Sequence, residues 1–269
     1  MKLLADDDPH VLQLLKENFA QMGSDGVAFL EAVTDDIHPG VRQSAKHILR
    51  DVRERHAWAA FDRFCVECAD HSDLESSCWL LARTRYPELD ETPYASRLDE
   101  MAVEIKRRLT GRETPRSTIE VCNHYLFRTL GFRGNHQDYY DADNSYLNRV
   151  LDRRLGIPIS LSVLYLSLGR RLSLPLLGIN LPGHFLLKWH STTAHFYVDA
   201  FNEGQLLRAD DCREVCERLG HTFRSAYLAP ASPRQILHRM CRNLQSIYAE
   251  SDPPRAEKLS NAVTLLVQG

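Results

Sequence analysis

The sequence predicts an α+β fold: an N-terminal helical part, then a core of one buried helix and a small antiparallel sheet, then C-terminal helices. Apolar residues recur at helical spacing through most of the first 155 residues. The stretch 159–172 is apolar nearly all round, which is typical of a buried helix. Residues 184–199 instead alternate between polar and apolar side chains, as strands do.

The first 56 residues are predicted to form two helix pairs with related beginnings. Asp7-Asp8-Pro9-His10-Val11 is echoed, at an offset of 30 residues, by Ile37-His38-Pro39-Gly40-Val41. Apolar residues at helical spacing follow each of them, and a proline at the start of a helix is a sound start signal. The period and the pattern resemble HEAT-type repeats. The alternative is a pair of unrelated helical hairpins.

Further helices are expected between this part and the core. Gly111–Pro115 is the best linker candidate, because it is rich in turn-forming and polar residues. The chain is therefore expected to divide into a helical part at 1–112, a core at 113–231 and a C-terminal helical pair at 232–269. The helices expected before the buried one are 58–69, 74–84, 94–109, 119–130 and 146–155.

The core is expected to be built on the buried helix. Pro158 suits its first position, with Gly156 in the turn before it. Ser232-Pro233 is a start signal for a long helix that runs through Tyr248. The remaining expected elements are strands at about 174–180, 184–190, 195–199 and 205–208, and helices at 210–219 and 254–267.

Composition limits the classes of function. Lys and Arg number 33 against 36 Asp and Glu, a net charge of −3, so nothing indicates a nucleic-acid binder. No apolar stretch is long enough for a signal peptide or a membrane span. The seven cysteines are irregularly spaced, which favours a reducing compartment, and we expect a cytoplasmic protein. Cys65-x-x-Cys68 lies on an apolar helical stripe and is expected to pack in the core.

Two alternating segments are predicted to form a hairpin. Residues 184–189 and 195–199 flank a four-residue loop at 190–193. Pairing of Trp189 with Ala194 sets the expected register, and a slip by one residue would move every side chain to the other face. One face then holds the apolar residues Phe185, Leu187, Trp189, Phe196 and Val198, and the other holds His184, Lys188, His195, Tyr197 and Asp199.

In this register His184 lies directly opposite Asp199, with Cβ atoms about 5 Å apart. The carboxylate would accept a hydrogen bond from one imidazole nitrogen and fix the tautomer, leaving the other nitrogen free as a base. The alternative is that His184 merely ends a strand and Asp199 begins a turn. Spacing alone leaves both interpretations open.

Several motifs in order resemble the bacterial SirB-type transglutaminase-like family. The central ones are Arg154-Leu-Gly-Ile-Pro-Ile-Ser-Leu-Ser162, Asn180-Leu-Pro-Gly-His-Phe185 and Val198-Asp-Ala-Phe-Asn-Glu-Gly204. Asn123-x-Tyr-Leu-Phe127, Tyr140-Asp-x-x-Asn-Ser-Tyr-Leu-Asn148 and Asn243-Leu-x-x-Ile-Tyr248 match the same family. The resemblance implies a papain-like core with a Cys-His-Asp triad, in which His184 matches the histidine and Asp199 the aspartate.

The family's cysteine is missing from this sequence. It should stand near Pro158 to Ser160, at the start of the buried helix, and no cysteine occurs there. A cysteine at a helix N-terminus ionises readily, whereas serine needs a well-placed base. Ser160 therefore has two interpretations: a hydroxyl that caps a free backbone N–H, or the nucleophile of a Ser-His-Asp arrangement.

Other candidate cleft residues are Asn144, Asn148, Pro158 and Tyr197. Asn144 is expected either to cap the helix at 146–155 or, like Asn148, to supply an amide donor near the site. The acidic run at 141–143 lacks the glycine and distal glutamate of a calcium loop, so no metal is expected. No other cofactor is indicated.

Three functions follow from these observations. The first is a binding or regulatory protein whose cleft around His184 and Asp199 holds a protein or peptide partner; the missing cysteine favours it. The second is a hydrolase or acyl-transfer enzyme with a Ser160-His184-Asp199 triad, favoured by the retained histidine and aspartate. The third is a helical scaffold without an active cleft. The oligomeric state is left open.

Overall fold

The computed structural model describes residues 4, 8–36, 38–68 and 70–268. They form two compact units. The smaller comprises residues 1–64 and 80–89, and the larger comprises residues 65–79 and 90–269. Residues 90–112 thus belong to the same compact unit as the sheet, although the sequence predicted a boundary at 112. Separation of 113–231 as a unit of its own stays a prediction.

The smaller unit is helical. α1 (Pro9–Gln21) and α2 (Gly23–Ala32) form the first predicted pair, but the second predicted pair is one helix, α3 (Pro39–Glu67). No glycine or proline interrupts residues 41–67, so nothing breaks this helix into two. The expected repeat of helix pairs is therefore not formed, and Asp7 and Ile37 of its pattern lie outside the described residues. The core includes Leu30, Val41, Ala45, Ile48 and Val52.

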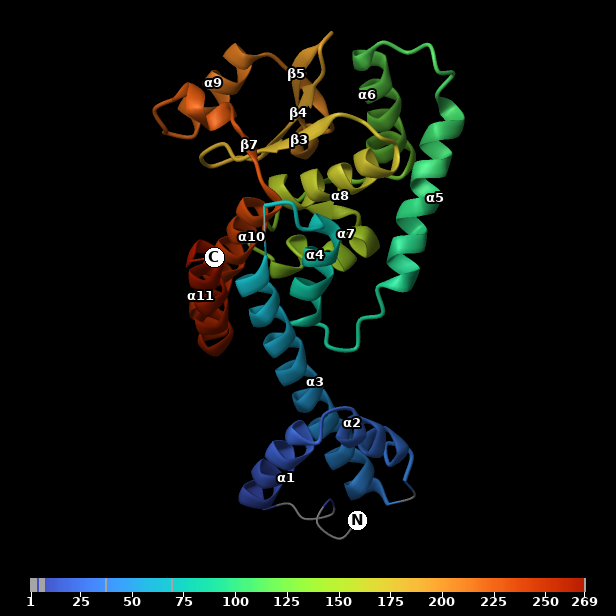
Figure 1. Cartoon of the computed structure of the whole chain (residues 1–269), viewed down its shortest axis with the longest axis vertical. Helices are drawn as coiled ribbons and strands as arrows, with labels where there is room; N and C mark the ends of the chain where they lie inside the picture. The colour runs from blue at the N-terminus through green and yellow to red at the C-terminus, as the bar shows by residue number, and fades with distance from the viewer. Residues whose placement is uncertain (1–3, 5–7, 37, 69, 269) are drawn as a thin grey trace. The chain divides into compact units, whose positions relative to one another are not determined.

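The larger unit holds the other helices (Figure 1). The sequence predicted each of them to within a few residues. The segment predicted as one α-helix at 119–130 differs in type: its second half is the π-helical turn η2 (His124–Thr129). The helices are α4 (Leu74–Arg83, which also enters the smaller unit), α5 (Thr92–Arg108), α6 (Pro115–Asn123), α7 (Leu147–Arg153), α8 (Pro158–Arg171), α9 (Ala209–Arg218), α10 (Pro233–Ser251) and α11 (Pro253–Gln268). Within the described residues, no helix is long and apolar enough to cross a membrane.

The larger unit contains a five-stranded antiparallel sheet in the order β6-β5-β4-β3-β7. A second, parallel pair joins β1 to β2. β1, β2 and β7 have two residues each, too few to show an alternating pattern in the sequence, and were not predicted. The strands are β1 (Arg133–Gly134), β2 (Leu155–Gly156), β3 (Leu176–Ile179), β4 (Leu186–His190), β5 (His195–Asp199), β6 (Gln205–Leu207) and β7 (Pro230–Ala231).

The β4–β5 hairpin has a different register from the predicted one. Trp189 pairs with Phe196, not with Ala194. The loop is 191–194 instead of 190–193, because the amide of Ser191 donates to the Ala194 carbonyl and the Ala194 amide donates to Ser191 Oγ. The slip is two residues, so the division of side chains between the two faces is unchanged. His184 precedes β4 and is no longer directly opposite Asp199.

Helices cover both faces of the sheet (Figure 1). α8 is buried along nearly its whole length and packs against β3 and β4, as the apolar run predicted. α9 packs against β5 and β6 on the other face, where Cys212 and Cys216 join Tyr197 and Leu207 in a second core. The face that was expected to be polar is therefore largely covered, and Tyr197 lies in that core instead of lining an open cleft.

Candidate functional site

His184 and Asp199 are in direct contact. The Nε2 atom of His184 lies 2.8 Å from Oδ2 of Asp199. A tight turn presents the histidine: Gly183 has φ +72°, and the backbone N–H of His184 donates to the Leu181 carbonyl at 3.0 Å. The histidine is only 7% exposed and the aspartate 2%. The expected pairing thus occurs through the turn before β4 and the end of β5.

Four donors hold the carboxylate of Asp199. Oδ2 accepts from His184 and, at 2.8 Å, from the Asn202 side chain. Oδ1 accepts from the backbone N–H groups of Phe201 and Asn202 at 3.1 and 3.3 Å, so Asp199 caps the short turn η4 (Ala200–Asn202). Burial by itself raises the pKa of Asp199, but the hydrogen bonds from His184 and Asn202 outweigh it, and the pKa lies below its ordinary value of 3.8.

The lowered pKa predicts a specific loss of stability in acid. Because the folded-state pKa of Asp199 is below the unfolded value, its stabilising contribution is full above pH 3.8 and is lost as pH falls below it. We expect the difference in free energy of unfolding between the wild type and Asp199→Asn to shrink as pH is lowered from 6 towards about 3. Urea unfolding across that range measures it. A difference that stays constant would contradict the prediction.

An aromatic ring connects this pair to the loop before α7. The ring centroid of Phe201 lies 6.2 Å from that of His184, 4.4 Å from that of His136 and 6.0 Å from that of Tyr139. A hollow of about 330 Å³ adjoins Phe201 and is also lined by His136 and Asn202. His136 and Tyr139 could not be predicted from the sequence, because loop residues have no periodicity. Phe201 and Asn202 belong to one of the family motifs, but no role was predicted for them.

Ser160 is used in the structure as a helix cap. Its hydroxyl accepts from the backbone N–H of Ile157 at 3.0 Å and donates to the Asn144 carbonyl at 2.5 Å. It is also buried. None of the hydrogen bonds that Ser160 makes within the described chain reaches His184. The hydroxyl proton therefore has an acceptor already, and that acceptor is a carbonyl oxygen instead of an imidazole.

The two asparagines differ from each other. Asn144 does not cap α7, whose N-cap is Tyr146. Its amide donates to the carbonyls of Asp138 and Tyr139 at 2.7 and 3.3 Å and so anchors the loop that carries Tyr139. Asn148 is buried in α7, and its Oδ1 has no hydrogen-bond partner among the described residues. Pro158 is the first residue of α8, as predicted.

Cys212 and Cys122 do not have the properties of activated nucleophiles. Cys212 of α9 lies near enough to Asp199 for the two charges to interact, yet its pKa is raised to about 12, chiefly by burial and then by Asp211 and Asp199. Burial likewise raises the pKa of Cys122, in α6, to about 11. A thiol of this kind stays protonated at neutral pH and is a poor nucleophile. Cys65 and Cys68 are buried, as predicted.

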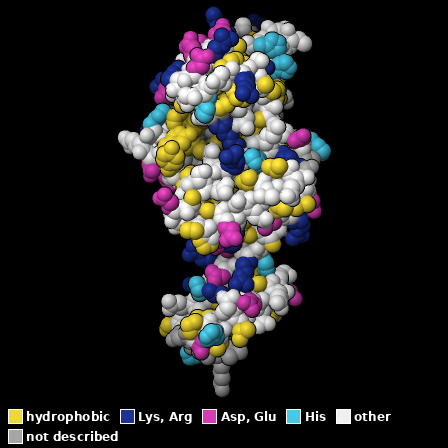
Figure 2. All heavy atoms as spheres, turned by 90° about the vertical axis from the view of Figure 1, so that its left-hand side faces the viewer, with side chains coloured by type: hydrophobic (Ala, Val, Ile, Leu, Met, Phe, Trp, Pro, Cys, Tyr) yellow, Lys and Arg dark blue, Asp and Glu magenta, His cyan; other side chains and the backbone are white. Residues whose placement is uncertain are grey.

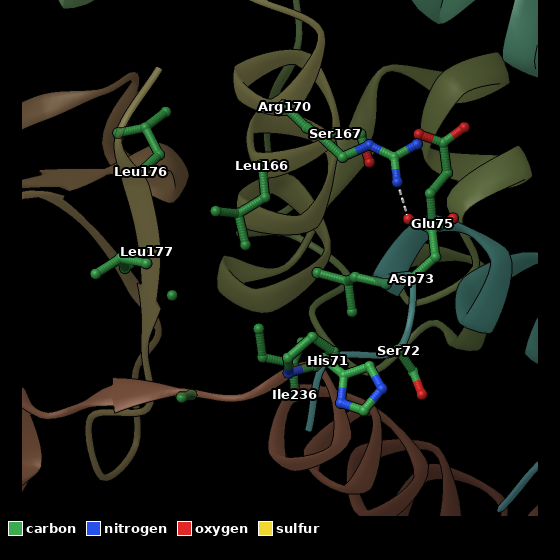
Figure 3. A pocket seen from close by; sticks show the side chains of 14 residues that line it. His71, Ser72, Asp73, Glu75, Leu166, Ser167, Arg170, Leu176, Leu177 and Ile236 are labelled. Atoms are coloured by element: carbon green, nitrogen blue, oxygen red, sulfur yellow. Dashed lines mark hydrogen bonds and ion pairs between the residues drawn. The ribbon is translucent and has the colours of Figure 1, made fainter. Parts of the chain in front are cut away.

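A second hollow of about 350 Å³ lies at the edge of β3, between α4, α8 and α10 (Figure 3). Leu166 of α8 and Leu176 and Leu177 of β3 line its apolar part. Asp73 and Arg170 form an ion pair at its rim. None of the predicted site residues lines this hollow. Within the described residues, no group of three or more His, Cys, Asp or Glu side chains is arranged to hold a metal ion.

A helix buried against an antiparallel sheet, with a histidine–aspartate pair at the strand ends, is the framework that the motifs implied. A model of the transglutaminase-like superfamily matches residues 92–242, which is more than half of the chain. This chain belongs to the transglutaminase-like superfamily. The resemblance is thus confirmed at the level of the superfamily.

Relatives occur in bacteria and in mammals. A UPF0162 protein of Xylella fastidiosa is 38% identical over 201 residues, which cover 72% of each chain. A UPF0162 protein of Pseudomonas aeruginosa is 31% identical over 201 residues, 71% of this chain and 72% of that one. F-box only protein 21 of the mouse is 33% identical over 192 residues, which are 68% of this chain but 28% of that protein. No solved structure matches significantly.

Proposed function

We propose that this protein is a non-catalytic member of its superfamily, a binding or regulatory protein that holds a protein or peptide partner near His184 and Asp199. The hydrogen bonding of Ser160 carries the proposal. Ser160 was the hydroxyl proposed to replace the missing cysteine, and in the structure it caps the first turn of α8. Covalent catalysis requires an activated nucleophile, and a hydroxyl held in this way is not one.

The retained pair has a structural use that requires no reaction. Asp199 makes three hydrogen bonds with residues of η4 and a fourth with His184, and it therefore fixes the position of Phe201 beside the histidine. The relative named F-box only protein 21 supports a role in protein interactions. Assignment to the SirB-type branch and a cytoplasmic location belong to the same proposal.

The competing function is a hydrolase with a Ser160-His184-Asp199 triad. The 2.8 Å contact between His184 and Asp199 favours it, because an aspartate on one imidazole nitrogen orients the other as a base. It requires Ser160 to release the Asn144 carbonyl and turn towards His184. That rearrangement would remove the side-chain cap from the first turn of α8.

A fluorophosphonate probe separates the two functions. It reacts with serine hydroxyls that an adjacent base activates. We expect the wild type to be labelled no more than Ser160→Ala, as measured by in-gel fluorescence and by intact-protein mass. Ser162→Ala is the matched control, because Ser162 lies on the same helix, is also buried and makes no hydrogen bond with the described residues.

Labelling of the wild type and of Ser162→Ala, with loss in Ser160→Ala and His184→Ala, would overturn the non-catalytic proposal. Iodoacetamide provides the equivalent test for thiols. Because the Cys122 and Cys212 thiols have raised pKa values, we expect them to react slowly in the folded protein at pH 7.

A further inference from the structure

Helix α10 carries two arginines that form no ion pair with the described residues. Arg242 lies three residues after Arg239, so the two share one face of the helix. Within the described chain, neither arginine forms an ion pair. Burial lowers the pKa of Arg239, the Tyr139 phenol acts in the opposite direction, and the positive charge of Arg242 lowers the pKa further. No carboxylate among the described residues acts on this pKa, so the charge of Arg239 is available to a ligand.

Neutral groups hold Arg239 in place. Its Nη1 donates to the Leu181 carbonyl at 2.7 Å and to the side-chain oxygen of Asn180. The guanidinium also lies 5.9 Å from the centre of the Phe185 ring. Its other nitrogens make no hydrogen bond with the described residues. A fixed guanidinium with unused donors is a good receptor for a carboxylate, because little side-chain freedom remains to be lost on binding.

This arginine is connected to the histidine–aspartate pair. The Leu181 carbonyl that accepts from Arg239 also accepts from the backbone N–H of His184. On the other side, the charge of Arg239 acts on the phenol of Tyr139, whose ring packs against Phe201 beside His184. The Arg239 side chain and the His184 turn are therefore linked through a single backbone carbonyl.

The face of the larger unit that carries α9, α10 and α11 is turned to the viewer in Figure 2. Lys and Arg side chains gather there in a hollow at the middle of that unit, with hydrophobic side chains at its border. Arg242 is exposed on α10, and Tyr140, next to Tyr139, is 77% exposed. Cations beside exposed aromatic and apolar groups suit a peptide, which offers both carboxylates and side-chain surface.

We propose that Arg239 and Arg242 bind carboxylates of an acidic segment of a partner protein. This deepens the proposed function and rests on it. Arg239 and Arg242 are almost one helical turn apart, about 5 Å along the axis, which suits two nearby carboxylates of one segment. A chain with a net charge of −3 has no general attraction for polyanions, so binding depends on this local cluster.

The test measures binding of rhodamine-labelled hexaglutamate to the full chain by fluorescence anisotropy, with hexaglutamine carrying the same dye as the reference. We expect hexaglutamate to bind more tightly, and Arg242→Gln and Arg239→Gln each to weaken it by about tenfold, as loss of a charge-assisted contact does. Arg112→Gln is the matched control: it removes the same charge at an exposed linker position and should change the affinity by less than about twofold.

Arg242 makes no side-chain hydrogen bond with the described residues, so its variant is expected to fold even if Arg239→Gln does not; thermal melting checks both. Equal binding of hexaglutamine, equal weakening by Arg112→Gln, or no binding at all would overturn the inference. So would tighter binding of a labelled oligonucleotide, or full competition by an equal concentration of inorganic phosphate. Labelling of Ser160 by fluorophosphonate would refute the non-catalytic role alone, whereas loss of the Arg242 dependence would refute only this inference.

Discussion

Asp199→Ala should destabilise the larger unit by about 3–4 kcal/mol. The substitution deletes the acceptor of four hydrogen bonds at a position that is 2% exposed. The backbone N–H of Phe201 then stays buried without a partner, which costs about 1–3 kcal/mol, and His184 and the part-buried donors of Asn202 lose their acceptor as well. Urea unfolding followed by circular dichroism measures the loss, with an unchanged denaturant slope as the sign that the unfolded state is unaffected.

Two variants separate burial from hydrogen bonding. Asp199→Asn keeps an oxygen for the two backbone donors and should cost about 1–2 kcal/mol. Glu113→Ala removes a carboxylate that also accepts three hydrogen bonds, but from an exposed linker where water replaces it, and should cost far less. A loss for Asp199→Ala that is no larger than that for Glu113→Ala would show that the network around Asp199 is dispensable.

The stability loss caused by Asp199→Ala distinguishes a structural role of the His184–Asp199 pair from a purely functional one. A pair that serves only a functional role would make Asp199→Ala cost little, whereas a loss above about 3 kcal/mol would indicate a buried structural network. The four hydrogen bonds in the structure favour the larger value. A loss of that size would mean that Asp199 organises its surroundings, whether or not the histidine beside it ever moves a proton.

Patterns with a regular period were predicted well. The apolar run of α8 and the alternation of β4 and β5 each follow from one local rule, and the faces of the hairpin were correct although its register was not. The predicted register was wrong because hydrogen bonds between Ser191 and Ala194 determine where the loop lies. These hydrogen bonds depend on side-chain geometry, which the alternation of polar and apolar residues does not reveal.

Contacts that lie far apart in the sequence could not be predicted in this way. Asn144 was expected either to cap the next helix or to supply an amide donor near the site. It anchors the loop before that helix instead, and its carbonyl accepts from Ser160, 16 positions away. No role could be predicted for Arg239 from the sequence, because arginine is common on the exposed faces of helices. Its significance comes from its hydrogen bond to the Leu181 carbonyl, 58 positions away, and from the fact that no carboxylate of the described residues forms an ion pair with it. Periodicity places side chains on faces but does not say which face meets which loop.

Gly204→Ala should lower the free energy of unfolding by about 3 kcal/mol or more, because it introduces both backbone strain and a steric clash. Gly204 has φ +76°, and a Cβ there would lie 2.0 Å from Oδ1 of Asn123. Asn123 cannot easily retreat, since its Nδ2 donates to the Gly204 carbonyl at 2.7 Å and its Oδ1 accepts from Tyr165 at 3.0 Å. The amide of Gly204 also closes the turn on the Asp199 carbonyl at 2.8 Å, so the clash is transmitted to the site.

Gly220→Ala isolates the backbone contribution. Gly220 has φ +81° but no atom within 4 Å of the added Cβ, so only the strain of about 1 kcal/mol applies. The excess loss in Gly204→Ala over Gly220→Ala, from urea unfolding, measures the clash with Asn123. That excess should fall in the Asn123→Ala background, because removing the amide makes room for the methyl group. Equal losses for the two alanine variants would mean that the turn after Asp199 yields freely, and the site would then lack the rigid support that its hydrogen bonds imply.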